Sequence, residues 1–234
     1  MHLPDQFLSN QTNFTLLVIS AGFLVNAFKS FFNSNFEKVK FLIPQLETGI
    51  GQKISSPKSL GYFKAKSHVN KKIEQLALVA AFIFALQMLN FPIQNGTSGH
   101  FLGGVLAAVV LGPWAGIMAI SSVLVVQAFI FSDGGIISLG ANIFNMGVIG
   151  VLFSYLIYLF IFQITRHRFL AIGLAGWFSV VLASIACSIE IGLSGQAALG
   201  LVLPAMLKVH VLIGMVEAFI TIFAIKIFFY EQEK

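Results

Sequence analysis

Long apolar runs are the feature that most constrains this chain. An α-helix of roughly 17–25 apolar residues is long enough to cross the hydrocarbon core of a bilayer. Only 10% of the 234 residues are charged, against roughly a quarter in an ordinary soluble domain. We therefore predict an all-α integral membrane protein of about seven transmembrane helices. The candidate spans lie near 12–32, 74–92, 101–112, 113–131, 137–163, 169–189 and 205–229.

The third of these runs is too short to cross a bilayer alone. It ends at Gly112-Pro113, where proline removes a backbone donor and restricts the residue before it. We expect the third and fourth runs to form a tight helical hairpin.

Small residues recur every four positions along this hairpin, at Gly104, Ala108, Gly112 and Gly116. This spacing lets membrane helices approach closely. The simpler interpretation is packing within the chain, and the alternative is a docking face for a partner membrane protein.

Lysine and arginine gather in alternate connections between the spans. Nine lysines, from Lys29 to Lys72, crowd the first connection, and Arg166 and Arg168 occupy the fifth. The intervening connections contain neither residue type. Because cytoplasmic loops accumulate these cations, we predict an N-terminus outside the cell and a cytoplasmic C-terminus. The segment 33–72 resembles a mobile polar loop, and we predict no fold for it. Its lysines explain the net charge of +5 without a nucleic-acid partner.

The N-terminus lacks the features of a secretory signal. Residues 1–28 contain no lysine or arginine, whereas a signal peptide begins with a basic region. We therefore expect Met1 and His2 to remain in the mature protein. Cys187 is the only cysteine, so the sequence provides neither a disulfide framework nor a thiolate cluster.

A histidine at position 2 can form a metal chelate with the N-terminus. The α-amine of Met1, with a pKa of about 7.7–8.0, loses its proton to a metal at modest cost. Together with the backbone nitrogen and imidazole of His2, it offers three nitrogens in one plane. Planar nitrogen coordination suits Ni²⁺ or Cu²⁺, and such a site could also hold Co²⁺.

The fourth nitrogen should come from the same face of the membrane, where His100 lies in FPIQNGTSGHFLGG. Thr97 and Ser98 offer hydroxyls that could orient its imidazole. The alternative is that His2 is incidental and that His100 caps a helix. We predict a metal site formed by Met1, His2 and His100.

Several stretches resemble the CbiM/NikM family of cobalt and nickel uptake proteins, which are substrate-binding membrane components of energy-coupling factor transporters. They are MHLPDQFL, NFPIQNGTSGHFLGGVLAAVVLGPWAGI, VVQAFIFSDGGIISLGANIFNMGVIG and HVLIGMVEAFIT. The resemblance implies an N-terminus that inserts into the bundle from outside, and a metal bound by Met1, His2 and His100. Gln6 departs from the family pattern, which usually has glycine there.

The sequence has no GxxxxGK[ST] phosphate loop, so we do not expect this chain to hydrolyse ATP itself. The resemblance implies that partner subunits do so. A transmembrane coupling subunit and ATPase subunits would supply the energy, and a small auxiliary membrane subunit is an open question. The chain itself is then no enzyme. It would lie in a prokaryotic plasma membrane and import Co²⁺ or Ni²⁺, which the sequence does not distinguish.

Polar side chains within the spans have two interpretations each. Asn142 and Asn145 share a helical face and either bond neighbouring helices or support the inserted N-terminus, a role we favour for Asn142. Asp133 is expected to cap a helix. Glu217 falls near the middle of the last span, where a charged carboxylate has a high free-energy cost. We favour a protonated or hydrogen-bonded structural carboxyl over a proton relay.

Two other function classes are alternatives. A proton-coupled secondary metal transporter would use Glu217, and an intramembrane enzyme would need a pair of catalytic groups at one depth that the sequence does not offer. The predicted organisation is a metal-binding segment over 1–11, a first helix over 12–32, a lysine-rich cytoplasmic loop over 33–72 and a six-helix core over 73–230.

Overall fold

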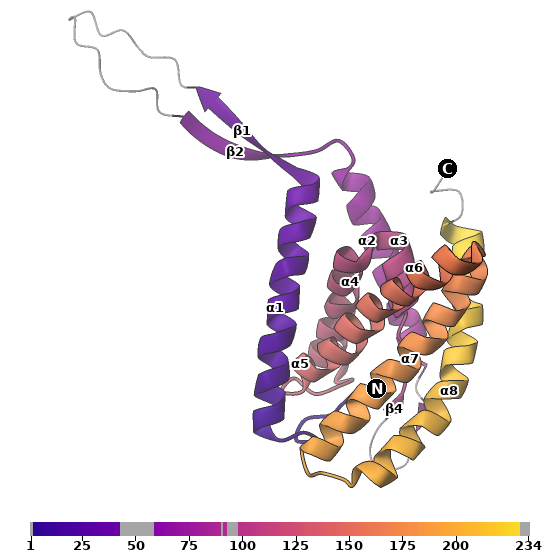
Figure 1. Ribbon diagram of the computed structural model, residues 1–234. Helices are drawn as coiled ribbons and strands as arrows, with labels where there is room; N and C mark the ends of the chain where they lie inside the picture. The colour runs from indigo at the N-terminus through magenta and orange to yellow at the C-terminus, as the bar shows by residue number, and fades with distance from the viewer. Residues whose placement is uncertain (1, 43–58, 90, 93–97, 230–234) are drawn as a thin grey trace, which may run out of the picture.

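The computed structural model describes residues 2–42, 59–89, 91–92 and 98–229. It is a helical bundle with a β-hairpin standing out from one end (Figure 1). Each of the seven predicted apolar runs is largely helical, so the predicted class of multi-pass helical membrane protein is confirmed. The α-helices are α1 Asn10–Asn35, α2 Val69–Gln87, α3 Gly104–Leu111, α4 Pro113–Val126, α5 Leu139–Asn142, α6 Ser154–Thr165, α7 Arg168–Leu193 and α8 Leu199–Ala224.

Three of the spans continue from α-helix into π-helix. These π-helical stretches are η1 Gln127–Phe131, η2 Ile143–Phe153 and η3 Ile225–Phe229. Among the described residues, five helices are long and apolar enough to cross a membrane. Of the remaining two segments, α3 has only eight residues and α2 begins with polar residues.

Part of the lysine-rich segment is folded, which corrects the expectation of a structureless loop. The strands β1 (Phe36–Leu42) and β2 (Ser59–Ala65) pair antiparallel, with Phe36 opposite Ala65 and Leu42 opposite Ser59. The hairpin is joined to α1, because the Lys66 ammonium donates to the Ser34 carbonyl at 2.9 Å. A second, two-residue pairing joins β3 (Phe91–Pro92) to β4 (Ser98–Gly99) just before α3.

The α3–α4 turn forms where the sequence predicted it. Gly112 has φ +81°, in the left-handed region that favours glycine, and Pro113 occupies the first turn of α4, where its missing donor is harmless. At Gly104 a side chain would collide with the backbone of Gly150, and at Gly116 it would lie 2.9 Å from Val151. These contacts favour the interpretation of the small residues as packing within the chain.

The two ends of the bundle differ in charge. Arg168 begins α7 at the hairpin end, and Lys226 lies there too, with its ammonium 4.6 Å from the Phe169 ring. Lys208, exposed in α8, is an exception. By the charge rule we call the hairpin end the inner end and the opposite end, which holds His2 and Asp133, the outer end.

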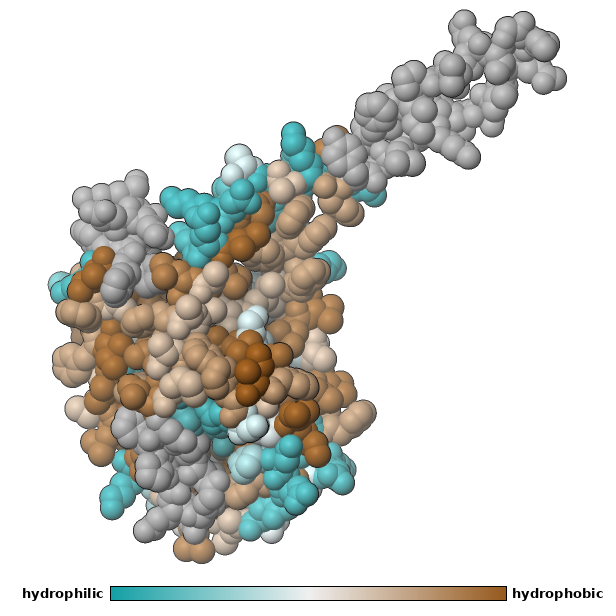
Figure 2. Space-filling model, turned by 180° about the vertical axis from the view of Figure 1, so that it is seen from behind, coloured by the Kyte–Doolittle hydropathy of each residue, from teal (hydrophilic) through white to brown (hydrophobic). Residues whose placement is uncertain are grey.

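Between these ends the surface is apolar. In Figure 2 brown and tan residues cover most of the middle of the bundle, and teal residues gather toward its two ends. Large apolar side chains point outward, including Phe14 at 68% and Phe219 at 73% exposed. A surface of this kind is suited to contact with lipid chains.

Candidate metal centre

The segment before α1 is inserted into the outer end of the bundle. Leu3 is fully buried. Its backbone nitrogen donates to Asn142 Oδ1 at 2.8 Å, and Asn142 Nδ2 donates back to the Leu3 carbonyl at 3.2 Å. Gly135 adds a third bond by donating its N–H to the same carbonyl at 2.8 Å. The Asn142 amide thus pairs with Leu3 much as a neighbouring strand would.

The turn that precedes α5 holds the next two residues. Asp5 Oδ1 accepts from the backbone nitrogens of Ile137 at 2.7 Å and Ser138 at 3.3 Å, and Ser138 Oγ donates to the Pro4 carbonyl at 3.0 Å. Gly135 lies so close to Asp5 that any side chain there would collide with it. We call residues 133–142, which make these contacts, the N-terminal clamp.

His2 is placed by this clamp against Asp133. The side chain of His2 is almost fully buried, and its Nδ1 lies 2.9 Å from Asp133 Oδ1. Neither ring nitrogen of His2 has a well-aligned hydrogen bond within the described part of the chain. Two ligands bound at right angles, each about 2.0–2.1 Å from one ion, are also about 2.9 Å apart. The contact is therefore compatible with a shared metal.

His100 lies beside His2, although 98 positions separate them in the sequence. The two ring centroids are 4.4 Å apart and the ring planes differ by 30°. His100 Nδ1 lies 2.9 Å from the Gln87 carbonyl. Because a carbonyl only accepts, Nδ1 carries the proton and Nε2 keeps its lone pair, which is the tautomer a metal ligand requires.

Glu217 fixes the chain just after His100. Its carboxylate accepts from the backbone nitrogens of Leu102 at 2.6 Å and Gly103 at 3.0 Å. Gln87 adds to this by donating its side-chain amide to the Leu102 carbonyl at 2.9 Å. These contacts favour the structural interpretation of Glu217 over the proton relay.

The charge states of the three groups suit a divalent cation. Burial lowers the pKa of His2, and burial together with nearby positive charge lowers the pKa of His100 to about 3, so both imidazoles are neutral near pH 7. Burial is the largest single influence on Asp133 and opposes its ionisation, but the contact with His2 and the neighbouring positive charge together outweigh it and hold the Asp133 pKa below its ordinary value. One ligand atom from each residue lies within 4.8 Å of the other two.

Not every predicted site residue can be placed. Met1 and Thr97 lie outside the described residues, and of Ser98 only the backbone, in β4, is described. Asn145 does not contact the inserted segment in any described bond; its Nδ2 donates to Glu190 Oε2 at 2.6 Å.

Asp133 has a side-chain contact that sequence reasoning missed. We expected a helix cap; its backbone N–H does donate to the Gln127 carbonyl of η1 at 3.0 Å, but its side chain contacts His2. The signal was present, since Asp133 is the acid of an outer connection on the same side as His2 and His100. Gln6, the departure from the family pattern, has φ 65°, a conformation that explains a preference for glycine.

Comparisons with known proteins agree with this architecture. The chain is 45% identical over 164 residues to a putative fused nickel transport protein NikMN of Archaeoglobus fulgidus, covering 69% of this chain and 55% of that protein. A probable fused nickel transport protein LarMN of Lactiplantibacillus plantarum is 31% identical over 95% of this chain and 62% of its own length. The chain thus spans little more than half the length of these two relatives.

Solved structures with the same fold include a transition metal transporter. Its crystal structure matches with a TM-score of 0.79 and 30% identity, covering 100% of this chain and 93% of that one. The family described as CbiM, "Cobalt uptake substrate-specific transmembrane region", matches residues 59–232. This match covers well over half of the sequence, and the chain therefore belongs to the CbiM family.

Proposed function

We propose that this protein is the substrate-binding membrane component of an energy-coupling factor transporter that imports Co²⁺ or Ni²⁺. The ion is held by the Met1 amine, the backbone nitrogen and imidazole of His2, and the imidazole of His100. The names of the relatives, which are nickel and cobalt transport proteins, support this cargo. The observation that carries the proposal is the placement of His2 against His100, with ring centroids 4.4 Å apart.

The clamp explains how a chain terminus can form a selective site. A free N-terminus samples many conformations, and ordering it costs about 1–2 kcal/mol of backbone entropy per residue. Here the bonds from Asn142 and Gly135 to Leu3 fix the adjacent backbone before an ion arrives. The binding free energy is then not spent on ordering this segment.

Asp133 balances the charge of the complex. A divalent ion bound by a deprotonated backbone amide retains one positive charge, which is unfavourable in a buried site. The Asp133 carboxylate, 2.9 Å from His2 Nδ1, supplies the second negative charge. We therefore add Asp133 to the proposed site as the counter-ion.

Energy for transport comes from partner subunits. A transmembrane coupling subunit and ATPases would bind this chain, which contributes ion selection. The rival, a proton-coupled secondary transporter, needs Glu217 to exchange protons, whereas both of its oxygens accept backbone hydrogen bonds. Uptake assays in vesicles with and without an added ATPase subunit separate the two mechanisms.

Metal binding by the purified protein tests the site directly. Titration calorimetry with Ni²⁺ and Co²⁺ is expected to give one site per chain. We expect binding to be lost in His100→Ala and after one residue is added ahead of Met1, and to fall about 10–100-fold in Asp133→Asn. His68→Ala is the matched control, because His68 is exposed at the inner end.

The proposal fails if the His100→Ala variant and the lengthened chain both bind either ion as tightly as the unmodified protein. A circular dichroism spectrum and a thermal unfolding curve for each variant show whether the bundle is intact. Loss of binding in His68→Ala at unchanged helicity would instead place the site at the inner end.

A further inference from the structure

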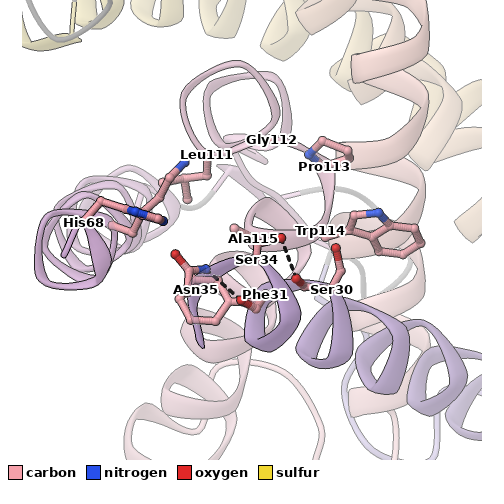
Figure 3. Close-up of a pocket in the computed structure, with 11 residues that line it drawn as sticks. Ser30, Phe31, Ser34, Asn35, His68, Leu111, Gly112, Pro113, Trp114 and Ala115 are labelled. Atoms are coloured by element: carbon pink, nitrogen blue, oxygen red, sulfur yellow. Dashed lines mark hydrogen bonds between the residues drawn. The ribbon is translucent and has the colours of Figure 1, made fainter. Parts of the chain in front are cut away.

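Titratable side chains at the two ends of the bundle differ in their access to water. At the inner end a pocket of about 170 Å³ opens between the end of α1, the start of α2 and the α3–α4 turn (Figure 3). His68 and Lys72 line this pocket and are exposed, so water can satisfy their hydrogen bonds. At the outer end Glu190, in the last turn of α7, is only 7% exposed. Its carboxyl must therefore be satisfied by the protein itself.

The partner of Glu190 is Asn145, and their contact is incomplete. Asn145 Nδ2 donates to Glu190 Oε2 at 2.6 Å. The other two oxygens of the pair, Glu190 Oε1 and Asn145 Oδ1, are buried and have no donor in the part of the chain that the structure describes. If Glu190 is ionised, both of these atoms are acceptors and neither can satisfy the other. The arrangement needs one more hydrogen.

A negative charge on Glu190 has no cation to compensate it among the described residues. The ion pairs of that part of the chain do not include Glu190. The connections at the outer end contain neither lysine nor arginine. Lys208, on the adjacent helix α8, is exposed and is likewise outside the described ion pairs. A buried carboxylate without a cation has a high free-energy cost, and such a group takes up a proton instead.

We propose that Glu190 carries a proton at neutral pH and that its Oε1 hydroxyl donates to Asn145 Oδ1. The two side chains then form a cyclic acid–amide pair, in which each donates one hydrogen bond to the other. A single added hydrogen satisfies both unpaired oxygens, and no buried charge remains. Glutamine at position 190 can form the same ring, because its amide also offers one donor and one acceptor to Asn145.

This pair positions the clamp that holds the metal-binding terminus, a role that rests on the proposed function. Asn145 lies three residues after Asn142, whose amide holds the inserted segment, and α5 continues directly into η2 between them. The end of α7 also contacts the start of α1, because Ser194 Oγ donates to Thr12 Oγ1 at 3.1 Å. Glu190 thus joins α7 to the helix that carries the clamp. It is a positioning residue for the metal centre and not a ligand.

Infrared difference spectroscopy of the full chain tests the proton on Glu190. The carbonyl stretch of a protonated carboxyl is separate from the bands of carboxylates and amides. In metal-free protein at neutral pH, we expect the unmodified chain to show such a band and Glu190→Gln to lose it. Glu74→Gln is the control, because Glu74 is exposed and its loss should leave the band in place. Identical spectra of the unmodified chain and Glu190→Gln in this region would overturn the proposal.

Nickel affinity and thermal stability of paired variants test the positioning role. Glu190→Gln keeps both hydrogen bonds of the pair, so its nickel affinity should stay within about twofold and its Tm within about 2 °C of the unmodified protein. Glu190→Leu and Asn145→Leu lose these bonds, and their nickel affinity should fall about tenfold. Ser188→Ala is the matched control, because Ser188 donates to the Ser184 carbonyl of its own helix at 2.7 Å.

The results separate the proton, the positioning role and the proposed function. A large rise in Tm in Glu190→Gln would show that the variant removes a buried charge, and would overturn the assigned proton. If a single leucine variant loses helicity, the double leucine variant leaves no polar atom unpaired and provides the nickel measurement. Unmodified nickel affinity in helical leucine variants would overturn the positioning role. No nickel binding by the unmodified protein would overturn the proposed function and this role together, whereas the infrared difference decides the proton alone.

Discussion

The two stretches that flank α1 differ in how the protein holds them. The stretch before α1, residues 2–9, is short and is fixed by groups more than 130 positions away, such as Asn142 and Gly135. The stretch after it, β1 and β2, is longer, and its ladder of hydrogen bonds lies between its own two strands. In Figure 1 this hairpin stands away from the bundle.

The difference shows that the stretch before α1 is the one whose backbone position is tightly constrained. Long-range bonds to a buried backbone constrain position to the accuracy that metal coordination requires. A hairpin held mainly by its own ladder can vary in length without disturbing the bundle. Each prediction below changes one of these stretches or a group that supports it.

Acidification should produce the largest effect on metal affinity. Below the amine pKa of about 7.7–8.0, binding releases one proton from the amine and one from the His2 amide, so affinity should fall about 100-fold per pH unit. Because burial lowers the pKa of His2 and lowers that of His100 to about 3, the imidazoles should add no further step near pH 6.5. Calorimetry in buffers of different ionisation enthalpy counts the protons. A tenfold slope would exclude release of both protons on binding.

Removal of the clamp should be the next largest effect. In Asn142→Leu the Leu3 carbonyl keeps its bond from Gly135, but the buried Leu3 N–H loses its partner, which costs about 1–3 kcal/mol. We expect nickel affinity to fall about 10–100-fold, measured by calorimetry. Asn26→Leu, on the exposed side of α1, should leave it unchanged. Equal affinities in the two variants would show that Leu3 need not be held.

The hydrogen bonds that Glu217 accepts from the backbone of Leu102 and Gly103, which we call the brace at His100, should matter less for metal affinity. In Glu217→Gln one carboxylate oxygen becomes a donor that faces a backbone N–H, either that of Leu102 or that of Gly103. We expect nickel affinity to fall about tenfold, with uptake falling in proportion at every pH. A proton relay predicts the reverse, with binding kept and uptake lost.

Much of the fold could be predicted from the sequence because lipid imposes a strong rule. A span must satisfy its own backbone hydrogen bonds, so apolar runs become helices wherever they are long enough. The break at Gly112-Pro113 was equally readable, since both residues act through local backbone geometry. The hairpin was missed because β1 and β2 lie within a segment that was read from its lysines as a polar loop, and because their ladder lies largely outside the core.

The candidate site was only partly predictable for a related reason. His2 and His100 were identified from their residue type and their common face, which require only topology. The side-chain contact of Asp133 with His2 was missed because it depends on how the clamp turns at Gly134, with φ +91°. No local pattern reports that a turn will meet a chain terminus.

A small gain in stability is expected from Gln6→Gly. Gln6 has φ 65°, and the left-handed conformation costs a non-glycine residue about 1–2 kcal/mol. Part of the gain is offset, because glycine increases the entropy of the unfolded chain. We expect the Tm to rise by about 2 °C, measured by thermal unfolding in detergent. Gln11→Gly, in the first turn of α1, should lower the Tm instead, and a fall in both variants would indicate that Gln6 makes a contact worth more than its strain.

Shortening the hairpin should change metal binding least. Replacing residues 38–63 by a short glycine-serine linker keeps Lys66, which anchors the hairpin to Ser34, and removes most of the ladder. Since the outer clamp and the brace at His100 make no described bond to this stretch, nickel affinity should stay within about twofold, a change of less than ~0.5 kcal/mol. The measurement is the same calorimetric titration, with Asn142→Leu run beside it as the variant that loses affinity. A tenfold loss in the shortened chain would show that the two flanks of α1 are coupled through the helix, and the contrast between a held terminus and an independent hairpin would then be wrong.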